Sequence, residues 1–259
     1  MNVLEVRELT KSFGGVIAVD GVDFDLRERE LLALIGPNGA GKTTCFNMLN
    51  GQLRPDAGSV TFVGRNLVGL RPRRIWRLGI GRTFQITQTF ASMTVRENVQ
   101  MALISHHREL YRVWRLAARQ HVQDADTLLQ QVGMADQAER AASVLAYGDL
   151  KRLELAIALA NRPKLLLMDE PTAGMAPKER AELMRLIASI VEADGISVLF
   201  TEHDMDVVFE HAHRIMVLNR GVLIAEGTAD EVRENSLVQD VYLGGGTMFQ
   251  GDEAKLGHG

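Results

Sequence analysis

The sequence predicts an α/β protein built around a mostly parallel β-sheet. Three apolar runs, at 31–35, 164–168 and 196–200, lack the polar alternation of a strand with one wet face. We therefore expect strands that are buried on both faces, as in parallel sheets. Helical stretches such as 177–193 separate or follow these runs, and an alternation of strand, loop and helix is typical of the α/β class.

The remaining segments refine this architecture along the chain. Residues 3–8 and 22–26 alternate in polarity, which predicts short strands and an antiparallel β portion near the N-terminus. A helix is expected over 42–50, with Gly51 at its C-cap. From about Thr94 to Gln137 the pattern is helical, which predicts an inserted α-helical subdomain. The expected parts are the N-terminal part of the core at 1–92, the helical subdomain at 93–155, the C-terminal part of the core at 156–243 and a flexible tail at 244–259.

Composition excludes several classes of protein. The 259 residues suffice for a large buried core, and a formal net charge of −4 gives no overall basic field that would favour nucleic acid as a partner. Cys45 is the one cysteine of the chain; this excludes an internal disulfide and a zinc cluster, and we expect a small buried side chain. The N-terminus is charged by residue five, and no apolar run approaches the roughly 20 residues that span a bilayer. We expect a soluble chain that reaches a membrane only by docking onto another protein.

A phosphate loop is the most specific local motif. Residues 36–43 read Gly-Pro-Asn-Gly-Ala-Gly-Lys-Thr and match G-x-x-x-x-G-K-[ST], directly after a buried strand and before a helix. Backbone N–H groups of such a loop surround a phosphate, and the helix N-terminus adds a positive potential. We expect Lys42 to bridge the β- and γ-phosphates and the Thr43 hydroxyl to ligate Mg²⁺. The candidate nucleotide-binding residues are Asn38, Gly39, Ala40, Gly41, Lys42, Thr43 and Thr44.

Two adjacent carboxylates follow the apolar run at 164–168. Asp169 and Glu170 stand where a strand ends, and the ligand crevice of an α/β sheet lies at the carboxyl ends of its strands. Asp169 is suited to the Mg²⁺ shell. Because neighbouring strand residues point to opposite sides, Glu170 is free to act as the general base on an attacking water.

At this point the chain resembles the ABC-type ATPases over nearly its whole length. Besides the phosphate loop and the carboxylate pair, five segments carry the resemblance: an adenine-stacking aromatic residue at Phe13, the Q-loop at 81–85, the signature motif at 145–149 with its helix, the D-loop at 173–176 and the switch region at 201–204. The resemblance implies a P-loop NTPase (RecA-like) core that binds ATP and Mg²⁺. It implies that Gln85 touches Mg²⁺ and water and that His203 contacts the γ-phosphate. The expected catalytic residues are then Glu170, His203 and Gln85, and the expected metal ligands are Thr43, Gln85 and Asp169.

The resemblance also implies a dimer, because ATP in this family lies between the phosphate loop of one subunit and the signature of another. Ala146, Tyr147 and Gly148 would therefore contact the nucleotide of the opposite site. Three residues depart from the family pattern: Ala146 replaces a serine, Asp149 replaces a glutamine, and Ala176 replaces the D-loop aspartate. These changes leave the chain's own site complete and weaken what it offers the opposite site, which predicts unequal sites or a non-identical partner ATPase.

A finer resemblance is to the longer ATPase of bacterial branched-chain amino acid importers. It rests on residues 82–85 and 93–99, the tyrosine-containing signature, residues 173–179, the ending at 241–244, and an extended helical insertion near 104–124. It implies a second ABC ATPase, two integral membrane permease subunits and, indirectly, a periplasmic substrate-binding protein, with this chain peripheral at the cytoplasmic face of the inner membrane. Related systems carry urea, amides or aromatic acids, and exporters have a similar ATPase. The resemblance therefore leaves both the cargo and the direction of transport open.

Two groups of arginines allow either of two interpretations. The first is a helix face made by Arg108, Arg112, Arg115 and Arg119, and the second is the cluster Arg71, Arg73, Arg74 and Arg77. Each is either a solvated face or a basic strip that lies against acidic lipid headgroups or a partner subunit.

Other classes of P-loop protein fit less well. ABC ATPases that act on DNA insert long coiled coils between the phosphate loop and the Asp-Glu strand, and no heptad run lies between Lys42 and Asp169. Ribosomal members carry two cassettes, whereas this chain has one. A kinase or GTPase has no use for the signature segment, and the Asn-Lys-x-Asp tetrapeptide that reads guanine is absent from the sequence. A module that only binds nucleotide has no need of Glu170 and His203.

Overall fold

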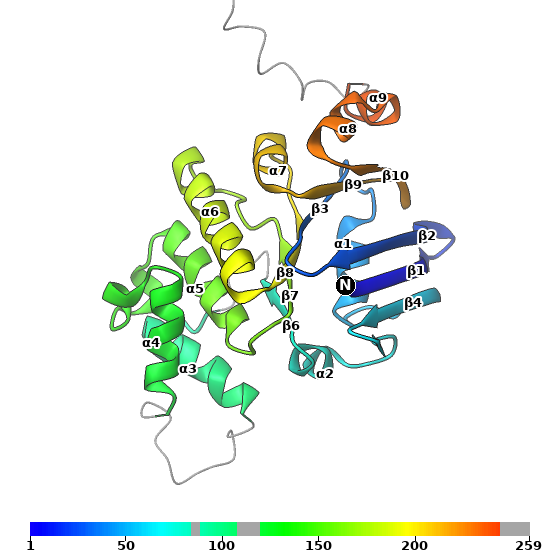
Figure 1. Cartoon of the computed structure of the whole chain (residues 1–259). Helices are drawn as coiled ribbons and strands as arrows, with labels where there is room; N and C mark the ends of the chain where they lie inside the picture. Colours follow the sequence, from blue (N-terminus) through cyan, green and yellow to red (C-terminus); the bar gives the residue numbers. More distant parts are fainter. Residues whose placement is uncertain (84–88, 108–119, 244–259) are drawn as a thin grey trace, which may run out of the picture.

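The computed structural model describes residues 1–83, 89–107 and 120–243. Its centre is a six-stranded sheet in which all neighbouring strands are parallel except the antiparallel edge pair β10 and β9 (Figure 1). In spatial order the strands are β10 (Val222–Gly227), β9 (Arg214–Asn219), β3 (Leu31–Ile35), β8 (Ser197–Thr201), β7 (Leu165–Asp169) and β6 (Ile80–Thr83). The predicted mostly parallel core sheet is confirmed.

A second, antiparallel sheet is formed mainly by the N-terminal quarter of the chain. Its strands, in spatial order, are β2 (Val16–Arg27), β1 (Asn2–Phe13), β4 (Ala57–Phe62) and β5 (Arg65–Asn66). This confirms the antiparallel portion, but β1 and β2 are twelve residues each rather than short. They are longer because their pairing continues through several β-bulges, which let polar residues stay at the surface while the ladder goes on.

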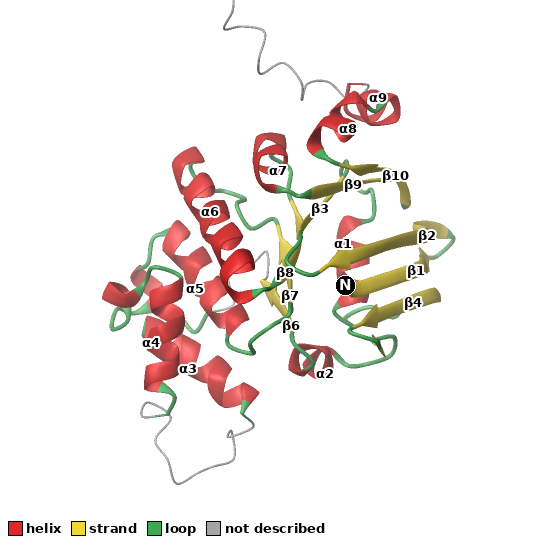
Figure 2. Ribbon diagram, viewed as in Figure 1, coloured by secondary structure: helices red, strands yellow, loops and turns green. Residues whose placement is uncertain are grey.

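Most helices lie on one side of the parallel sheet, whereas the antiparallel sheet and the first two helices pack on the other (Figure 2). The helices are α1 (Lys42–Leu49), α2 (Pro72–Arg77), α3 (Val95–His106), α4 (Val122–Gln131), α5 (Tyr147–Leu159), α6 (Pro177–Asp194), α7 (Met205–His211), α8 (Ala229–Glu234) and α9 (Ser236–Leu243), with 3₁₀ turns at Ala135–Gln137 and Ala142–Val144. Helices α3, α4 and α5 pack against one another (Figure 1), and most of their residues fall within 93–155, the stretch that the sequence predicts as a helical subdomain. Among the described residues, none of these helices is both long and apolar enough to cross a bilayer.

The apolar runs belong to two hydrophobic cores, one on each face of the parallel sheet. Successive strand residues point to opposite faces, so Leu31, Ala33 and Ile35 of β3 join the core under the helices. Leu32 and Leu34 join the core shared with α1 and the antiparallel sheet. Burial on both sides is why these strands show no polar alternation.

The predicted element bounds differ slightly from those observed. The strands expected at 164–168 and 196–200 lie one residue further along, because Asp169 pairs in register with Thr201 and adds a polar rung at the end of the ladder. Helix α1 ends at Leu49 and its C-cap is Asn50, so the prediction that Gly51 is the C-cap is wrong by one residue. Gly51 instead follows the cap with φ of 76°, a left-handed conformation that glycine adopts without steric cost. The tail at 244–259 and the arginine face at 108–119 lie outside the described residues.

Candidate functional site

The phosphate loop joins β3 to α1 at the carboxyl end of the parallel strands. Two of its glycines are held close to other backbone: a Cβ on Gly36 would lie 2.0 Å from the carbonyl oxygen of Leu218, and one on Gly41 would lie 2.3 Å from that of Ala18. Gly41 has φ of 107° and is the N-cap of α1. Only glycine combines that conformation with that clearance, so the loop is shaped by β2 and β9 as well as by its own sequence.

The side chain of Lys42 folds back onto the start of the phosphate loop. Its Nζ donates to the backbone oxygens of Gly36 at 2.7 Å and Pro37 at 3.2 Å, and its side chain is buried. Burial lowers the pKa of Lys42, while the negative charges of Glu170 and Asp169 act in the opposite direction. The loop cation and both predicted carboxylates therefore lie within electrostatic reach of one another, as their proposed roles require.

Asp169 is buried and anchored by two residues that were not among the predicted site residues. The hydroxyl of Thr201 donates to its Oδ1 at 2.8 Å, and Nη2 of Arg82 lies 3.4 Å from its Oδ2. Arg82 also donates to Asn47 of α1 at 3.0 Å and to Gln52 at 3.1 Å, so it ties the carboxylate to the helix after the phosphate loop. Burial lowers the pKa of Arg82, and the charge of Asp169 acts against that shift.

Glu170 follows the end of β7 in a left-handed conformation with φ of 50°, which is uncommon for a residue other than glycine and costs of the order of 1–3 kcal/mol. Its backbone N–H donates to Thr201, which holds the turn. Its side chain accepts a hydrogen bond from Nε2 of His203 at 2.8 Å. The candidate base and the switch histidine, which are far apart in sequence, are thus brought into direct contact.

Glu202, the residue before His203, stabilises this arrangement through hydrogen bonds to Thr172. It accepts hydrogen bonds from the backbone N–H and the hydroxyl of Thr172, at 2.8 and 2.7 Å, and is buried. Burial raises its pKa, an effect that the Thr172 hydrogen bonds oppose. The carboxylate thereby joins the switch region to the turn that carries Glu170, a role that its place inside the Thr-Glu-His-Asp segment did not reveal.

The signature segment opens α5, and its tyrosine packs within the same chain. Ala146 is the N-cap in extended conformation, and no side-chain hydrogen bond caps the helix. The ring of Tyr147 lies against Gly174, where a Cβ would be 3.4 Å from it, and Nζ of Lys151 lies 5.5 Å from the ring centroid. The signature and the 173–176 segment are therefore neighbours. Ala176 is likewise the N-cap of α6, with a methyl group where a capping oxygen would stand.

The comparisons with known proteins agree with this geometry. The family model described as ABC transporter matches residues 19–173. The chain is 42% identical, over 252 residues, to the high-affinity branched-chain amino acid transport ATP-binding protein LivG of Salmonella typhimurium, a match that covers 93% of this chain and 98% of the relative. This chain belongs to the ABC transporter family. It is an ATP-binding and ATP-hydrolysing subunit of a transporter.

Further matches place the ATPase more narrowly. A family model described as branched-chain amino acid ATP-binding cassette transporter matches residues 222–247, and LivG of Escherichia coli K12 is 40% identical with the same coverage. Among solved structures, an ATP-binding cassette of an ABC transporter in its ADP conformation superposes with a TM-score of 0.85 at 31% identity, covering 94% of this chain and 99% of that one. A dimeric post-hydrolysis cassette bound to ADP and Pi gives a TM-score of 0.75 at 26% identity, over 87% and 98% of the two chains.

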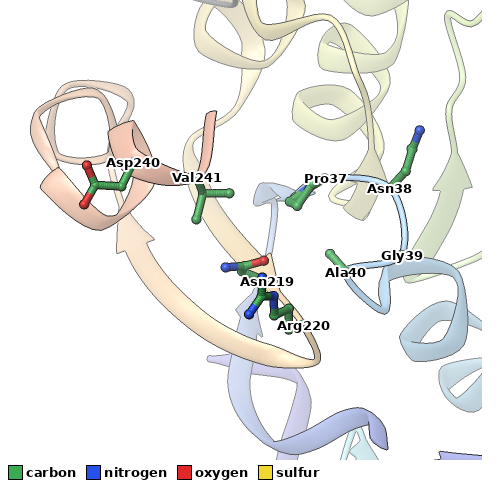
Figure 3. A pocket seen from close by; sticks show the side chains of 8 residues that line it. All are labelled: Pro37, Asn38, Gly39, Ala40, Asn219, Arg220, Asp240 and Val241. Carbon is green, nitrogen blue, oxygen red and sulfur yellow. The ribbon is translucent and has the colours of Figure 1, made fainter. Parts of the chain in front are cut away.

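The C-terminal part of the ATPase reaches the phosphate loop, which was not predicted. A pocket of about 500 Å³ separates residues 37–40 of the loop from the β9–β10 turn and α9 (Figure 3). Beside it, burial raises the pKa of Tyr242 to about 12, although a hydrogen bond from the Gly36 backbone acts in the opposite direction. The segment that matches the branched-chain model thus supports the first glycine of the loop.

The other predicted site residues are placed less directly. Phe13 ends β1 with 49% of its surface exposed, which leaves a face free to stack on a base, and Nζ of Lys11 lies 5.6 Å from its ring centroid. Gln85 lies outside the described residues. Cys45 is buried, as expected, and burial raises the pKa of its thiol to about 12.

The donor set suits Mg²⁺ better than a transition metal. Thr43 is exposed at the first turn of α1, and Asp169 supplies a carboxylate. Over the described residues, His, Cys, Asp and Glu side chains form no group of three that could hold a metal ion. Mg²⁺ is commonly held by one or two protein oxygens together with the phosphates of a nucleotide, and the hydroxyl and carboxylate fit that pattern.

Gly41→Ala is expected to destabilise the ATPase far more than Gly39→Ala. Both glycines have positive φ, so alanine costs about 1–2 kcal/mol at either. Only at Gly41 does the added Cβ meet backbone, at 2.3 Å from the Ala18 oxygen, whereas no atom lies within 4 Å at Gly39. The clash adds about 1–3 kcal/mol. Urea unfolding of the two variants measures the difference, and equal losses of stability would contradict the steric argument.

Ala146→Ser is expected to stabilise α5 by about 1 kcal/mol, because a hydroxyl at the N-cap accepts a hydrogen bond from the N–H of the second or third helical residue. The N-cap position already has the extended conformation that such a cap requires. The measurement is the urea midpoint of the variant against Ala91→Ser, a substitution at an exposed loop position. A midpoint no higher than that of the control would show that the helix start is not limited by capping.

Proposed function

We propose that this chain is the longer ATPase subunit of an importer for branched-chain or related amino acids. It would work at the cytoplasmic face of the inner membrane with a second ABC ATPase, two integral membrane permease subunits and, indirectly, a periplasmic substrate-binding protein. One observation supports an ATP-hydrolysing subunit rather than a module that only binds nucleotide. It is the convergence of four side chains at one edge of the parallel sheet: Lys42, Asp169, Glu170 and His203. Identity of 42% to LivG over 93% of the chain supports the cargo class.

The proposed cycle begins when ATP binds over the phosphate loop. Lys42 turns from its backbone acceptors toward the β- and γ-phosphates, and the exposed ring of Phe13 stacks on adenine. Thr43, Gln85 and Asp169 would hold Mg²⁺, which when bound neutralises charge on the two terminal phosphates. Arg82 and Thr201 keep Asp169 in place.

Closure of two subunits brings the partner's signature onto this ATP, and residues 146–148 of this chain onto the opposite one. Glu170 then takes a proton from the water that attacks the γ-phosphorus, and the bond from that phosphorus to the bridging oxygen breaks, so ADP and phosphate leave. His203, which donates to the Glu170 carboxylate at 2.8 Å, positions it and faces the γ-phosphate. A group that removes a proton in the transition state contributes about 10²–10⁴-fold in rate. Because Ala146 and Ala176 lack the family's polar side chains, the site that this chain completes on its partner is the weaker one.

The assembly is tested by recovering tagged Glu170→Gln protein with ATP from detergent-solubilised membranes of the native cell and identifying its partners by mass spectrometry. Two membrane proteins and a second, different ATPase would support the importer. Recovery with ribosomes or DNA would overturn it in favour of a non-transport ABC ATPase.

The cargo is tested separately, by uptake of labelled leucine, urea and an aromatic acid in cells that carry the wild-type or the Glu170→Gln allele. Loss of leucine uptake alone supports the proposed cargo. Loss of urea or aromatic-acid uptake with leucine uptake retained would reassign the transporter.

A further inference from the structure

Five arginines line one pocket at the edge of the molecule, beside α2. The pocket has a volume of about 540 Å³ and is bordered by Leu78 and by Arg65, Arg71, Arg73, Arg74 and Arg77. Helix α2, which carries three of them, lies at the end of the parallel sheet next to β6 (Figure 1). Arg65 comes from β5 of the antiparallel sheet, so the fold adds a fifth guanidinium to the group of four that is visible in the sequence.

Few acidic groups of the protein lie near enough to neutralise the positive charge of these arginines. In the described part of the protein, Arg65, Arg71, Arg73 and Arg74 have no carboxylate within ion-pair distance, and their side chains donate no hydrogen bond to the protein. The sequence explains the absence of nearby acids, since residues 57–96 contain neither aspartate nor glutamate. Like charges gathered in this way repel one another, in a chain whose net charge is −4. An external anion would relieve the repulsion.

We propose that this arginine pocket binds the phosphodiester headgroup of an acidic phospholipid. A guanidinium presents a planar fork of donors that matches phosphate oxygens bidentately, and basic residues next to an anionic membrane each add about 1 kcal/mol of binding. The inference rests on the proposed function, because a transporter ATPase works beside a membrane. It adds a direct contact of the ATPase with lipid to its docking on permease subunits.

Two features favour a lipid headgroup over a soluble polyanion. Val63, two residues before Arg65 in the sequence, is 52% exposed, so the turn that leads to Arg65 presents an apolar side chain of the kind that enters a headgroup boundary. A lipid surface also engages one face of the protein, whereas a long nucleic acid would meet the acidic remainder of the chain.

The test is co-sedimentation of the full chain with vesicles of phosphatidylcholine alone or mixed with phosphatidylglycerol. Wild-type protein should bind the mixed vesicles and not the neutral ones. Arg71→Gln/Arg74→Gln should weaken binding by about 30-fold, from two charges at the value above. The matched control is Arg140→Gln/Arg185→Gln, which removes the same charge from two exposed arginines outside the pocket and should bind like wild type. An equal loss of vesicle binding in both double variants would overturn the proposal, because binding would then depend on the overall charge of the protein and not on the pocket.

A second measurement separates lipid from free phosphate and checks folding. The thermal midpoint of Arg71→Gln/Arg74→Gln at low salt should equal or exceed that of wild type, because repulsion is removed. A lower midpoint would show that the arginines are structural and overturn the proposal. Inorganic phosphate that raises the wild-type midpoint but not that of the variant, without vesicle binding, would assign the pocket to a soluble phosphorylated ligand instead.

A failure of the lipid site can be distinguished from a failure of the proposed function. ATP hydrolysis by wild-type protein without vesicle binding counts against the lipid site alone. Vesicle binding that the double variant loses, in a chain that is recovered from its cell with ribosomes or DNA, supports the lipid site and counts against the proposed importer.

Discussion

Glu170→Gln is expected to reduce ATP hydrolysis by about 10²–10⁴-fold, the usual contribution of a positioned general base. Glutamine keeps the size of the side chain and its ability to accept a hydrogen bond from His203, which Glu170 accepts at 2.8 Å, but it cannot take a proton from water. The affinity for ATP should persist, because the phosphate loop and Lys42 are unchanged. Phosphate release and binding of a fluorescent ATP analogue, measured with the partner ATPase present, separate the two effects.

The matched control for this variant is Glu192→Gln, which removes the same charge from an exposed position of α6. It should hydrolyse ATP at the wild-type rate. A Glu170→Gln protein that retains more than about a tenth of wild-type turnover would fall outside the range for a general base and would assign that role to another group, with His203 the first to examine.

Lys42→Met is expected to weaken ATP binding by about 10- to 100-fold, the cost of about 1.5–3 kcal/mol for losing hydrogen bonds to a charged group. The ammonium is held at the loop by the oxygens of Gly36 and Pro37 and lies within reach of two carboxylates. Methionine fills a similar volume without donors or charge. Calorimetric titration with Mg-ATP measures the affinity.

Lys178→Met serves as the control, because Lys178 lies exposed in the first turn of α6 and is not part of the phosphate loop. It should bind ATP like wild type. If Lys42→Met bound ATP with unchanged affinity while its circular dichroism spectrum matched wild type, the nucleotide would have to bind elsewhere than over the phosphate loop.

Local patterns were enough to predict much of this molecule. The phosphate loop, the Asp-Glu pair and the buried strands could be predicted from residues within a few positions of each other, because strand burial and loop shape impose local rules on residue type. Small errors arose at the ends of strands. The polar pair Asp169 and Thr201 makes two strands end one residue later than predicted, because hydrophobicity alone stops at the last apolar position.

The site required more than local rules. Arg82 could be recognised in the sequence only as part of a resemblance, yet it bonds Asp169, Asn47 and Gln52. Glu202 looked like a spacer before His203 and proves to join two turns through Thr172. In both cases the partners become neighbours through the order of β6, β7 and β8 in the sheet, which alternation of polarity does not encode.

The sequence by itself therefore determined the class of fold and the nucleotide chemistry, and it supplied the residues that we propose perform it. Only the tertiary structure decided that His203 bonds Glu170, that Tyr242 reaches Gly36, and that Arg65 joins the arginines of α2 in one pocket. The physical reason is that such contacts join segments far apart along the chain. Such contacts can stabilise the protein only after burial of both faces of the parallel sheet has brought those segments together.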